Sequence, residues 1–480
     1  MSEITPFWLA GRPETGEETS TVVHPFDGQP VAGVAVPTEA QVDEAVAAAA
    51  TVRTDAAALP AHDRAAALQH VCDQIAERRE EVARLITAEN GKPLKWSRIE
   101  VTRAVSTFRW AAEEARRFSG TLQRLDTDPT STGRLALVRR FPRGPVLGIS
   151  PFNFPLNLVA HKVAPAIAVG APIVVKPAPR TPLSALLLGE LLAETDLPAG
   201  MVSVLPVPNE RAAALVADPR LPVVSFTGSG PVGWQLAEAV PRKHVTLELG
   251  GNAAAMVCAD YSDDADLDWA AQRIATFSNY QAGQSCIAVQ RVLVDRAVAA
   301  QLVPRIVEQV RAQVAADPND DATDVGPMIS VEAAERVERW VREAVDAGAT
   351  VLTGGTREGA AYAPTVLADV PTDARVLREE VFGPVLTITE FDGLDEGFAL
   401  VNGSEYGLQA GVFTRDVQTA FAAHRALEVG GVVVGDVPSY RADQMPYGGT
   451  KGSGIGREGV RSAMQDYTED RVLVLTGLDL

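Results

Sequence analysis

Residues 146–176 read VLGISPFNFPLNLVAHKVAPAIAVGAPIVVK, in which two short apolar runs enclose a longer segment that is itself largely apolar. The first run, 146–149, predicts a strand. The segment through 163–169 predicts a helix, and 173–175 predicts a second strand. Short apolar strands separated by helices are typical of a parallel sheet that is covered on both faces. We therefore expect an α/β fold built around this stretch.

The same alternation continues on the C-terminal side of this stretch. Further strands are predicted at 202–205, 223–226 and 245–248, with helices at 184–195, 210–217 and 232–239 between them. After Gly251 the alternation restarts, with predicted elements at 253–258, 265–280, 288–294, 297–315, 331–347, 384–390, 410–414 and 416–427. We expect two doubly wound parallel-sheet domains, which bind ligands at the carboxyl ends of their strands.

The flanking segments differ from this pattern. Residues 1 to about 60 predict a surface arm of short strands and turns, and two helices follow, from Asp63 and over 96–118. Residues 135–140 and the tail 470–475 each predict a strand outside the main sheets. Together these two strands could form a small β flap that pairs with another subunit.

Composition narrows the functional classes. A net charge of −19 over 480 residues, without a block of lysines or arginines, argues against nucleic-acid and membrane surfaces. The amino-terminal residues lack the pattern of a signal peptide, and no stretch of eighteen apolar residues occurs. The three cysteines form no C-x-x-C pair and the six histidines show no ligand spacing, so we expect no metal site and a reducing cytoplasm as the location.

One cysteine stands apart from the other two. Residues 277–292 read FSNYQAGQSCIAVQRV and place Cys286 on a polar turn between a predicted helix and a predicted strand. Such a position exposes a thiol to an incoming ligand, whereas a structural cysteine usually lies within an apolar pattern. Cys72 and Cys258 have that pattern and are predicted to be buried. Cys286 is a candidate nucleophile, which the turn alone does not establish.

Two further polar residues follow predicted strands. Glu248 ends a strand in the run LELGGN, where a partly buried carboxyl group could act as a base. Asn153, in PFNFP, could donate a hydrogen bond to a developing oxyanion. The alternatives are a solvated glutamate and an asparagine that stabilises a turn, and both are common.

A third group of residues suits a nucleotide. Gly228, Ser229 and Gly233 follow the strand at 223–226 and open a helix, whose N-terminus favours a pyrophosphate. Their spacing is not that of the usual dinucleotide fingerprint, so the motif is weak on its own. Lys176, at the end of the strand 173–175, could reach a nucleotide hydroxyl or phosphate, or could be an ordinary surface lysine.

Taken together and in order, seven segments resemble the aldehyde dehydrogenase superfamily, nearest its lactaldehyde and semialdehyde branch. The segments are PFNFP, KPAPRTP, FTGSGPVG, LELGGN, GQSC, EEVFGPV and MPYGGTKGSGIGREG. The resemblance implies NAD(P)-dependent oxidation of an aldehyde to an acid through a cysteine thiohemiacetal and a thioester. It also implies a cofactor domain (1–118 and 141–251), a catalytic domain (252–460) and an oligomerisation flap (119–140 and 461–480) in a homodimer or homotetramer.

The resemblance assigns roles residue by residue. It makes Cys286 the nucleophile, Glu248 the base for thiol and water, and Asn153 with the main-chain N–H of Cys286 the oxyanion site. Lys176 would bind the adenosine ribose, Ser229 the pyrophosphate, and Glu380 with Phe382 the nicotinamide riboside. The other residues implied to contact the cofactor are Ser150, Pro151, Phe152, Pro179, Gly228, Gly233, Leu249 and Gly250.

Two positions depart from the family pattern. Pro179 stands where a glutamate commonly binds the adenosine ribose, and Arg180 is its neighbour. Without that carboxylate a 2′-phosphate meets no like charge, so we expect either NAD or NADP to be accepted. Gly435 stands where relatives usually have an asparagine.

The sequence says less about the substrate. The resemblance implies a tunnel lined by Phe154, Leu158, His161, Tyr280, Ser285, Ile287 and Tyr440, with Arg109, Trp110 and Arg441 near its mouth. Two arginines could hold a carboxylate or phosphate, which would suit a small polar or anionic aldehyde. Arg109 could instead pair with Glu113 one helical turn later.

Two other functions are considered. A CoA-acylating semialdehyde dehydrogenase would transfer the acyl group to CoA, but that branch generally lacks the glutamate found here as Glu248. A non-enzymatic structural or binding protein of the same fold need not keep Cys286, Glu248 and Asn153 together. Both remain alternatives to hydrolytic aldehyde oxidation.

Overall fold

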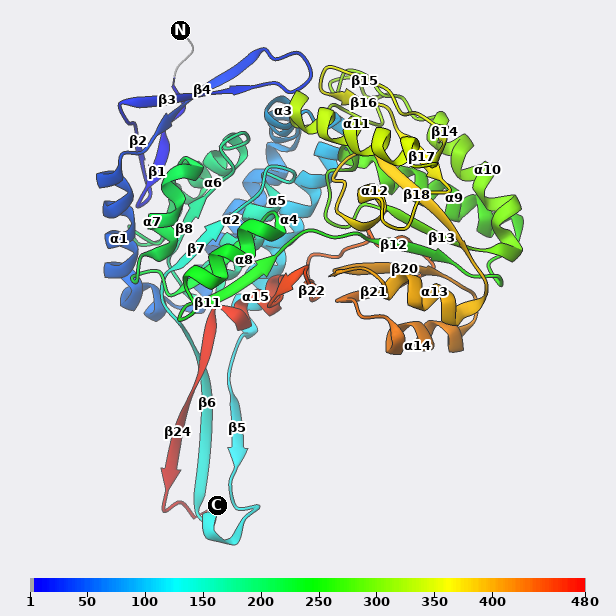
Figure 1. Cartoon of the computed structure of the whole chain (residues 1–480). Coiled ribbons are helices and arrows are strands. Elements are labelled where there is room, and N and C mark those ends of the chain that lie inside the picture. The colour runs from blue at the N-terminus through cyan, green and yellow to red at the C-terminus, as the bar shows by residue number, and fades with distance from the viewer. Residues whose placement is uncertain (1–3, 480) are drawn as a thin grey trace.

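The computed structural model describes residues 4–479 and is built on two large sheets (Figure 1). The first sheet has the strand order β2–β1–β9–β8–β7–β10–β11–β23, and its five strands from β9 to β11 are parallel. In that order the strands span Arg12–Glu14, Phe7–Leu9, Val202–Val204, Ile173–Lys176, Val146–Ile149, Val223–Thr227, His244–Glu248 and Gly454–Ile455. Strands β7 and β8 are buried along their whole length, which explains their uninterrupted apolar sequence.

Helix α5 (Asn157–Val169) forms the centre of the first domain. It packs against β7 and β8 and is enclosed by α2, α4 and α15, so that all of its residues are buried. The neighbouring helices are α1 (Glu39–Ala58), α2 (Ala61–Glu77), α3 (Arg79–Asn90), α4 (Leu94–Arg117), α6 (Leu183–Ala193), α7 (Ala212–Ala217), α8 (Gly230–Ala239) and α15 (Val460–Asp466). Because His161 and Lys162 lie within α5, their polar groups need buried partners.

The second sheet has the order β14–β17–β18–β13–β12–β20–β21, parallel except for the edge pair β14–β17. Its strands span Thr350–Thr353, Thr365–Ala368, Val385–Phe391, Arg291–Asp295, Ala254–Val257, Gln409–Phe413 and Gly431–Val434. The helices around it are α9 (Asp264–Asn279), α10 (Arg296–Arg311), α11 (Val331–Asp346), α12 (Arg375–Arg378), α13 (Gly393–Asn402) and α14 (Val417–Ala426). Two parallel-sheet domains are therefore present, as the sequence predicted.

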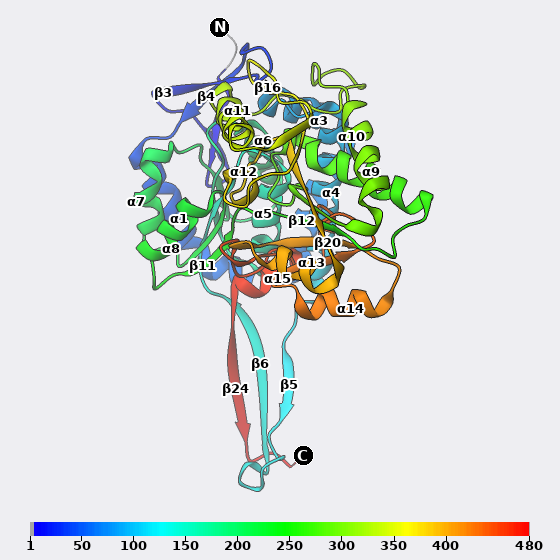
Figure 2. The same cartoon turned by 45° about the vertical axis from the view of Figure 1, so that its right-hand side comes forward.

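A three-stranded arm projects from the body (Figures 1 and 2). It consists of β5 (Thr121–Arg124), β6 (Arg134–Pro142) and β24 (Thr468–Thr476), with β6 in the middle. The tail strand β24 pairs antiparallel with β6 along its whole length. The pairing predicted between 135–140 and 470–475 is thus formed. Smaller two-stranded pairs are β3–β4 (Glu18–Val23, Pro30–Val36), β15–β16 (Arg357–Glu358, Ala361–Tyr362) and β19–β22 (Tyr406–Gly407, Thr450–Lys451).

The N-terminal prediction was partly wrong. Phe7 and Leu9 are buried in the core because β1 adds to the first sheet beyond β9, so this segment is not simply a surface arm. The long helix α1 was also missed. It begins at a capping box in which Thr38 and Gln41 bond each other's main-chain N–H, a signal present in the sequence.

The strand predicted at 288–294 begins only at Arg291. The preceding residues continue the turn, because the side chain of Gln290 bonds main-chain groups of Val376, Glu379 and Val381. Cys72 and Cys258 are buried, as predicted. Within residues 4–479, no helix is both long and apolar enough to cross a membrane.

Candidate active site

Cys286 is held by a strained turn between the two sheets. After α9 ends, Gln281, Ala282 and Gly283 adopt left-handed conformations, with φ of 55°, 52° and 68°. Such conformations cost free energy and persist only where the surroundings impose them. Gln281 donates a hydrogen bond to Asn90, and Gln284 donates one of 3.1 Å to the Gln281 carbonyl. The turn is therefore fixed by its neighbours.

The thiol of Cys286 has one hydrogen-bond partner in the described chain. Its Sγ lies 3.0 Å from the hydroxyl oxygen of Tyr447. Burial raises the pKa of the thiol to about 12; Glu380 and Glu248 act in the same direction, while Tyr447 and Arg441 oppose the rise. The thiolate needed for nucleophilic attack therefore depends on these opposing groups and on a base.

Glu248 ends β11 and is 3% exposed. Among residues 4–479, neither of its carboxylate oxygens has a hydrogen-bond partner. Burial, reinforced by the nearby charge of Glu458, raises the pKa of Glu248 well above its usual range. A buried carboxyl group with free oxygens and a raised pKa is suited to accept and return a proton.

Asn153 lies between the first sheet and the cysteine turn. Its Nδ2 donates a hydrogen bond of 2.8 Å to the carbonyl of Gln284, which leaves one of its two amide hydrogens without an acceptor in the described part of the chain. The main-chain N–H of Cys286 likewise has no acceptor there. Both groups are free to donate to an oxyanion that forms next to the sulfur.

A cleft of about 840 Å³ runs from the carboxyl ends of the first sheet to Cys286. All but one of the residues that the sequence predicted to contact the cofactor line this cleft. They are Ser150, Pro151, Phe152, Lys176, Pro179, Gly228, Ser229, Leu249, Gly250, Glu380 and Phe382 on its wall, with Gly233 packed directly behind Leu249. The same cleft is also lined by Asn153, Leu158, Glu248 and Cys286.

The residues of the cleft fit a dinucleotide. Helix α8 begins at Gly230, and Ser229 before it makes no side-chain cap, so the first main-chain N–H groups remain available to a pyrophosphate. Lys176 bonds Asn209 at 2.8 Å, and burial lowers the pKa of this lysine to about 8. A side chain at Gly250 would collide with the carboxylate of Glu380. Because glycine has no side chain, that carboxylate can approach the main chain at Gly250.

An aromatic wall lies next to the cysteine turn. The hydroxyl of Tyr280 donates a hydrogen bond of 2.7 Å to Ser285, and its ring packs against those of Phe154 and Trp96. Ile287 is buried against Tyr447. Of the other tunnel residues predicted from the sequence, Leu158 lines the cleft that reaches Cys286, whereas Tyr440 is half exposed.

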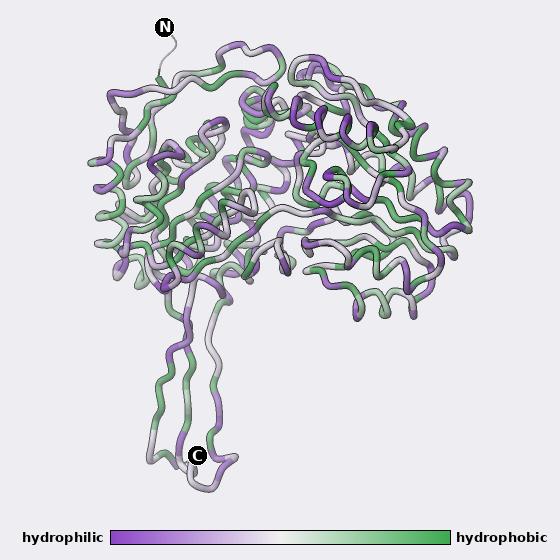
Figure 3. Tube along the Cα trace, viewed as in Figure 1, coloured by the Kyte–Doolittle hydropathy of each residue, from purple (hydrophilic) through white to green (hydrophobic). Residues whose placement is uncertain are grey.

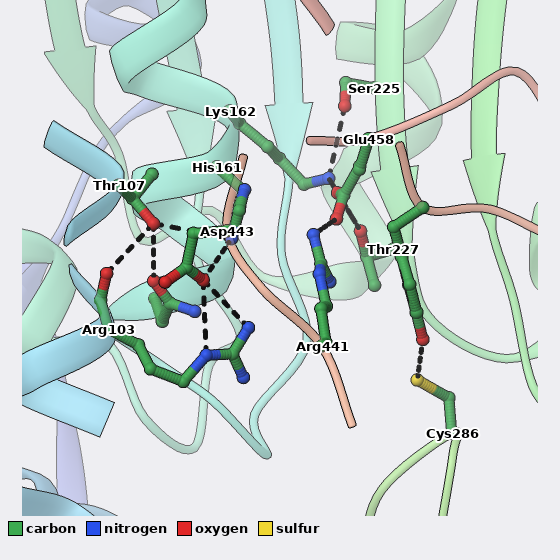
Figure 4. Close-up of polar contacts among 12 residues, drawn as sticks. Arg103, Thr107, His161, Lys162, Ser225, Thr227, Cys286, Arg441, Asp443 and Glu458 are labelled. Atoms are coloured by element: carbon green, nitrogen blue, oxygen red, sulfur yellow. Dashed lines mark hydrogen bonds and ion pairs between the residues drawn. The ribbon is translucent and has the colours of Figure 1, made fainter. Parts of the chain in front are cut away.

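Figure 4 shows two groups of buried charges in the same region as Cys286. In one, the carboxylate of Glu458 pairs with Lys162 at 3.0 Å and Arg441 at 3.2 Å. Burial alone would raise the pKa of Glu458, but Lys162 and Arg441 outweigh burial and lower it to about 2. Glu458 is therefore ionised, and its charge opposes ionisation of Glu248.

The second group centres on Asp443. Its carboxylate pairs with Arg103 at 2.9 Å and with His161 at 3.2 Å. His161 was predicted to line the tunnel, but it is enclosed between Asp443 and Thr107. His161 therefore belongs to the charged group around Asp443 and does not line the tunnel.

Arg109 does not reach this region. It is exposed on α4 and forms no ion pair in the described chain, with Glu113 or with any other residue. The arginine of α4 that does reach the charged groups is Arg103. Arg109 was predicted near the mouth of the tunnel; in the structure its charge lies close enough to Cys72 of α2 to affect that thiol. Trp110 packs partly buried against the core.

The sequence analysis missed Arg103, Lys162, Tyr447 and Glu458. Lys162 carried a usable signal, because a lysine within an apolar helix implies a buried carboxylate partner. Tyr447 stood in the quoted segment MPYGG, but nothing local indicated that its hydroxyl reaches Cys286.

The aldehyde dehydrogenase family model matches residues 12–473. The chain belongs to the aldehyde dehydrogenase family. It is 42% identical over 469 residues to 3-sulfolactaldehyde dehydrogenase of Priestia megaterium, which covers 98% of this chain and 97% of that protein. The family and the enzyme class predicted from the sequence are thereby confirmed.

Two solved structures extend the comparison. Aldehyde dehydrogenase 21 of Physcomitrella patens, in complex with the reaction product succinate, has a TM-score of 0.97 and 44% identity, covering 100% of this chain and 99% of that one. The glyceraldehyde-3-phosphate dehydrogenase of Methanocaldococcus jannaschii, complexed with NADP, has a TM-score of 0.91 and 35% identity, covering 96% and 100%. This chain is an NAD(P)-dependent aldehyde dehydrogenase with the fold of these enzymes.

Proposed function

We propose that this aldehyde dehydrogenase oxidises a small polar or anionic aldehyde to the carboxylic acid and releases the acid by hydrolysis. The observation that carries this proposal is the position of Glu248. It lies buried in the same cleft as Cys286, with both carboxylate oxygens free of partners in the described residues. A CoA-acylating enzyme has no need of a base for water, and a binding protein has no need of any of these groups.

In the proposed reaction, the Cys286 proton passes to Glu248 as Sγ bonds to the carbonyl carbon. The carbonyl electron pair moves to the oxygen, which accepts hydrogen bonds from Asn153 and from the main-chain N–H of Cys286. A nicotinamide bound in the cleft would supply the acceptor for the hydride that leaves this carbon, as the oxygen electron pair re-forms the C=O bond of the thioester. Glu248 next releases the cysteine proton to solvent. The ionised Glu248 then takes a proton from water as the water oxygen bonds to the thioester carbon, and the C–S bond breaks to return the thiolate, which recovers its proton from Glu248.

The cofactor contacts are proposed on the cleft residues. Lys176 would bind the adenosine ribose, the N-terminus of α8 at Ser229 the pyrophosphate, and Glu380 with Phe382 the nicotinamide riboside. Pro179 lines the cleft and carries no charge, so a 2′-phosphate meets no carboxylate from this position. We propose that both NAD and NADP are accepted.

The charge of the substrate is proposed from Arg441 and from the relatives. The side chain of Arg441 is 5% exposed, and its Nε has no hydrogen-bond partner among residues 4–479. Two of the relatives described above are named for sulfolactaldehyde and glyceraldehyde 3-phosphate, and the structure of the third contains the reaction product succinate. Each of these compounds carries an anionic group. A buried arginine with a spare donor suits such a group.

The arm supports an oligomer. Val472, Leu473 and Val474 of β24 are 61%, 56% and 49% exposed, and Figure 3 marks hydrophobic residues along the arm. Neighbouring residues of a strand face opposite sides, so apolar groups are exposed on both faces of the strand. We propose that the free edge of β24 pairs with the free edge of β21 in a second subunit, in a homodimer or homotetramer.

A cytoplasmic location is proposed from the thiols. Cys72, Cys258 and Cys286 are all free, and the proposed reaction requires a reduced Cys286. A reducing compartment maintains that state.

The test measures the turnover of matched aldehydes with NAD and with NADP in the absence of CoA. Turnover is monitored by the absorbance of the reduced cofactor. The pairs are succinic semialdehyde and butanal, glyceraldehyde 3-phosphate and glyceraldehyde, and 3-sulfolactaldehyde and lactaldehyde. We expect kcat/KM for the anionic members to be about tenfold higher or more, since a charge-assisted bond is lost in the neutral members. Cys286→Ala should abolish all turnover.

Arg441→Gln should reduce the preference within each pair, whereas Arg109→Gln, a matched exposed arginine, should leave that preference unchanged. Turnover only with CoA would identify an acylating enzyme. Cofactor binding without any turnover would favour the non-enzymatic alternative.

A further inference from the structure

We infer that Tyr447 is a catalytic residue whose hydroxyl donates a hydrogen bond to the Cys286 thiolate, both before attack and when the thiolate departs. This inference rests on the proposed function, because it concerns the nucleophile of that reaction. It begins from the contact between Tyr447 Oη and Cys286 Sγ at 3.0 Å.

The direction of this hydrogen bond follows from the ionisation state. In the neutral thiol either group can donate, but a thiolate can only accept. Burial raises the pKa of Tyr447 well above its usual range, so the phenol keeps its proton while the thiol ionises. The protonated phenol is therefore the donor when Sγ is a thiolate.

The position of Tyr447 is fixed by its main chain. Its N–H donates a hydrogen bond of 2.9 Å to the carbonyl of Glu458, and the N–H of Glu458 donates one of 2.6 Å in return. Its ring packs against Ile287 and Leu408. A hydroxyl held in this way costs little conformational entropy when it bonds the thiolate.

Arg441 strengthens the donor. Its guanidinium lies 3.9 Å from the centroid of the Tyr447 ring, which places a positive charge against the phenol. That charge makes the phenol a stronger hydrogen-bond donor, and it also favours the thiolate directly. The salt bridge with Glu458 holds the guanidinium in place.

The remaining charges around the sulfur act in the opposite sense. Glu248 and Glu380 both face Cys286, and Glu248 also faces Tyr447; each carboxylate disfavours a nearby thiolate. Because burial disfavours it as well, the Tyr447 bond and Arg441 are the two influences that favour ionisation of the thiol.

The same bond serves both halves of the reaction. Before attack, Glu248 takes the proton from Sγ while Tyr447 stabilises the resulting thiolate. During hydrolysis the C–S bond breaks and its electron pair returns to sulfur, where the Tyr447 hydroxyl again donates. The hydroxyl keeps its own proton throughout, so no additional reactant is needed.

The test is the pH dependence of Cys286 alkylation by iodoacetamide in wild type and in Tyr447→Phe, with the modified cysteine identified by peptide mapping. The substitution keeps the ring and its packing but removes the donor. We expect the apparent pKa of Cys286 to rise by about one unit and its alkylation at pH 7.5 to slow about tenfold, since a unit corresponds to a factor of ten. Tyr362→Phe, which removes a buried hydroxyl elsewhere, should leave the profile unchanged.

An alkylation profile of Tyr447→Phe that coincides with wild type would overturn the inference. Should this variant not fold, 3-fluorotyrosine at all seven tyrosines provides a second route. The more acidic phenol should lower the apparent pKa of the thiol, and an unchanged profile would again overturn the role of Tyr447.

Alkylation requires no aldehyde, so it tests the role of Tyr447 independently of the proposed function. A shifted alkylation profile in an enzyme that oxidises none of the aldehydes would leave the Tyr447 contact standing and reject the proposed substrates. In an active enzyme, kcat/KM of Tyr447→Phe should fall about tenfold at pH 7.5 and recover at higher pH, with cofactor affinity unchanged. A structural role would not produce that recovery.

Discussion

The main-chain N–H of Gly251 donates a hydrogen bond of 2.9 Å to Oε1 of Glu380. Gly251 follows β11 of the first sheet, whereas Glu380 precedes β18 of the second, so this bond joins the two domains beside the cofactor cleft. Burial raises the pKa of Glu380 to about 7, although this bond and Arg336 oppose the rise.

This pKa predicts a pH dependence of cofactor binding. Ribose hydroxyls donate more strongly to a carboxylate than to a carboxylic acid, and Glu380 ionises as the pH rises through about 7. We therefore expect the Kd of the cofactor to fall about fivefold or more between pH 6 and 7.5, measured by fluorescence quenching. Lys176 has lost half of its charge at about pH 8, which ends the useful window.

Glu380→Gln is the matched variant for this measurement. It should bind the cofactor more weakly at pH 7.5 and show almost no dependence on pH in the same window. A variant that keeps the wild-type pH dependence would show that another group controls cofactor binding.

Glu248→Gln tests the base for water. The amide cannot accept a proton, so we expect kcat to fall by a factor on the order of 10²–10⁴, the usual contribution of a general base. The acyl group should then remain on Cys286 and be visible as added mass in the intact protein. Cys286→Ala should carry no added mass, and a kcat of Glu248→Gln close to wild type would reject the role.

The elements around the site could be predicted because short apolar strands and helical periodicity are local properties of the sequence. The rotation of α4 about its own axis could not be predicted in this way. Whether Arg103 or Arg109 reaches the charged groups depends on which face of α4 packs against α5 and on the position of Asp443, far along the chain. The contact of Tyr447 with Cys286 likewise joins residues 161 positions apart. Local patterns carry no information on such pairs.

Gly435 is a position where the structure explains what the sequence left open. Its φ is 76°, and a side chain there would meet no atom within 4 Å. Glycine and asparagine are the residues that adopt this left-handed conformation most readily, which accounts for both residues at this position.

Pro179→Glu tests the cofactor preference. A carboxylate at this position of the cleft would repel a 2′-phosphate but could accept hydrogen bonds from the ribose hydroxyls of NAD. We expect kcat/KM with NADP to fall about tenfold or more relative to kcat/KM with NAD. The NAD reaction of the same variant is the internal control, and an unchanged ratio would mean that Pro179 does not set the preference.

The double substitution Val472→Lys and Val474→Lys tests the arm. The two residues lie on one face of β24, and two charges there would oppose burial in a subunit interface. We expect dissociation toward monomers, measured by light scattering after size exclusion. Val331→Lys, at an exposed valine that begins α11, should keep the wild-type mass. A double variant that retains the wild-type mass would place the interface elsewhere.

Gly283→Ala tests whether the strained turn positions Cys286. Gly283 has a φ of 68°, and a Cβ would lie 2.1 Å from the carbonyl oxygen of Gly383. The collision requires the cysteine turn to move, so we expect a loss of about 2 kcal/mol or more in the free energy of unfolding and a marked loss of kcat.

Gly359→Ala separates conformational strain from collision. Gly359 also has a positive φ, of 56°, but nothing lies within 4 Å of its Cβ position. We expect this control to lose only about 1 kcal/mol, the cost of the left-handed conformation, and to keep its activity. If both variants lost the same free energy and Gly283→Ala kept its kcat, contact with Gly383 would not be what holds Cys286 in place.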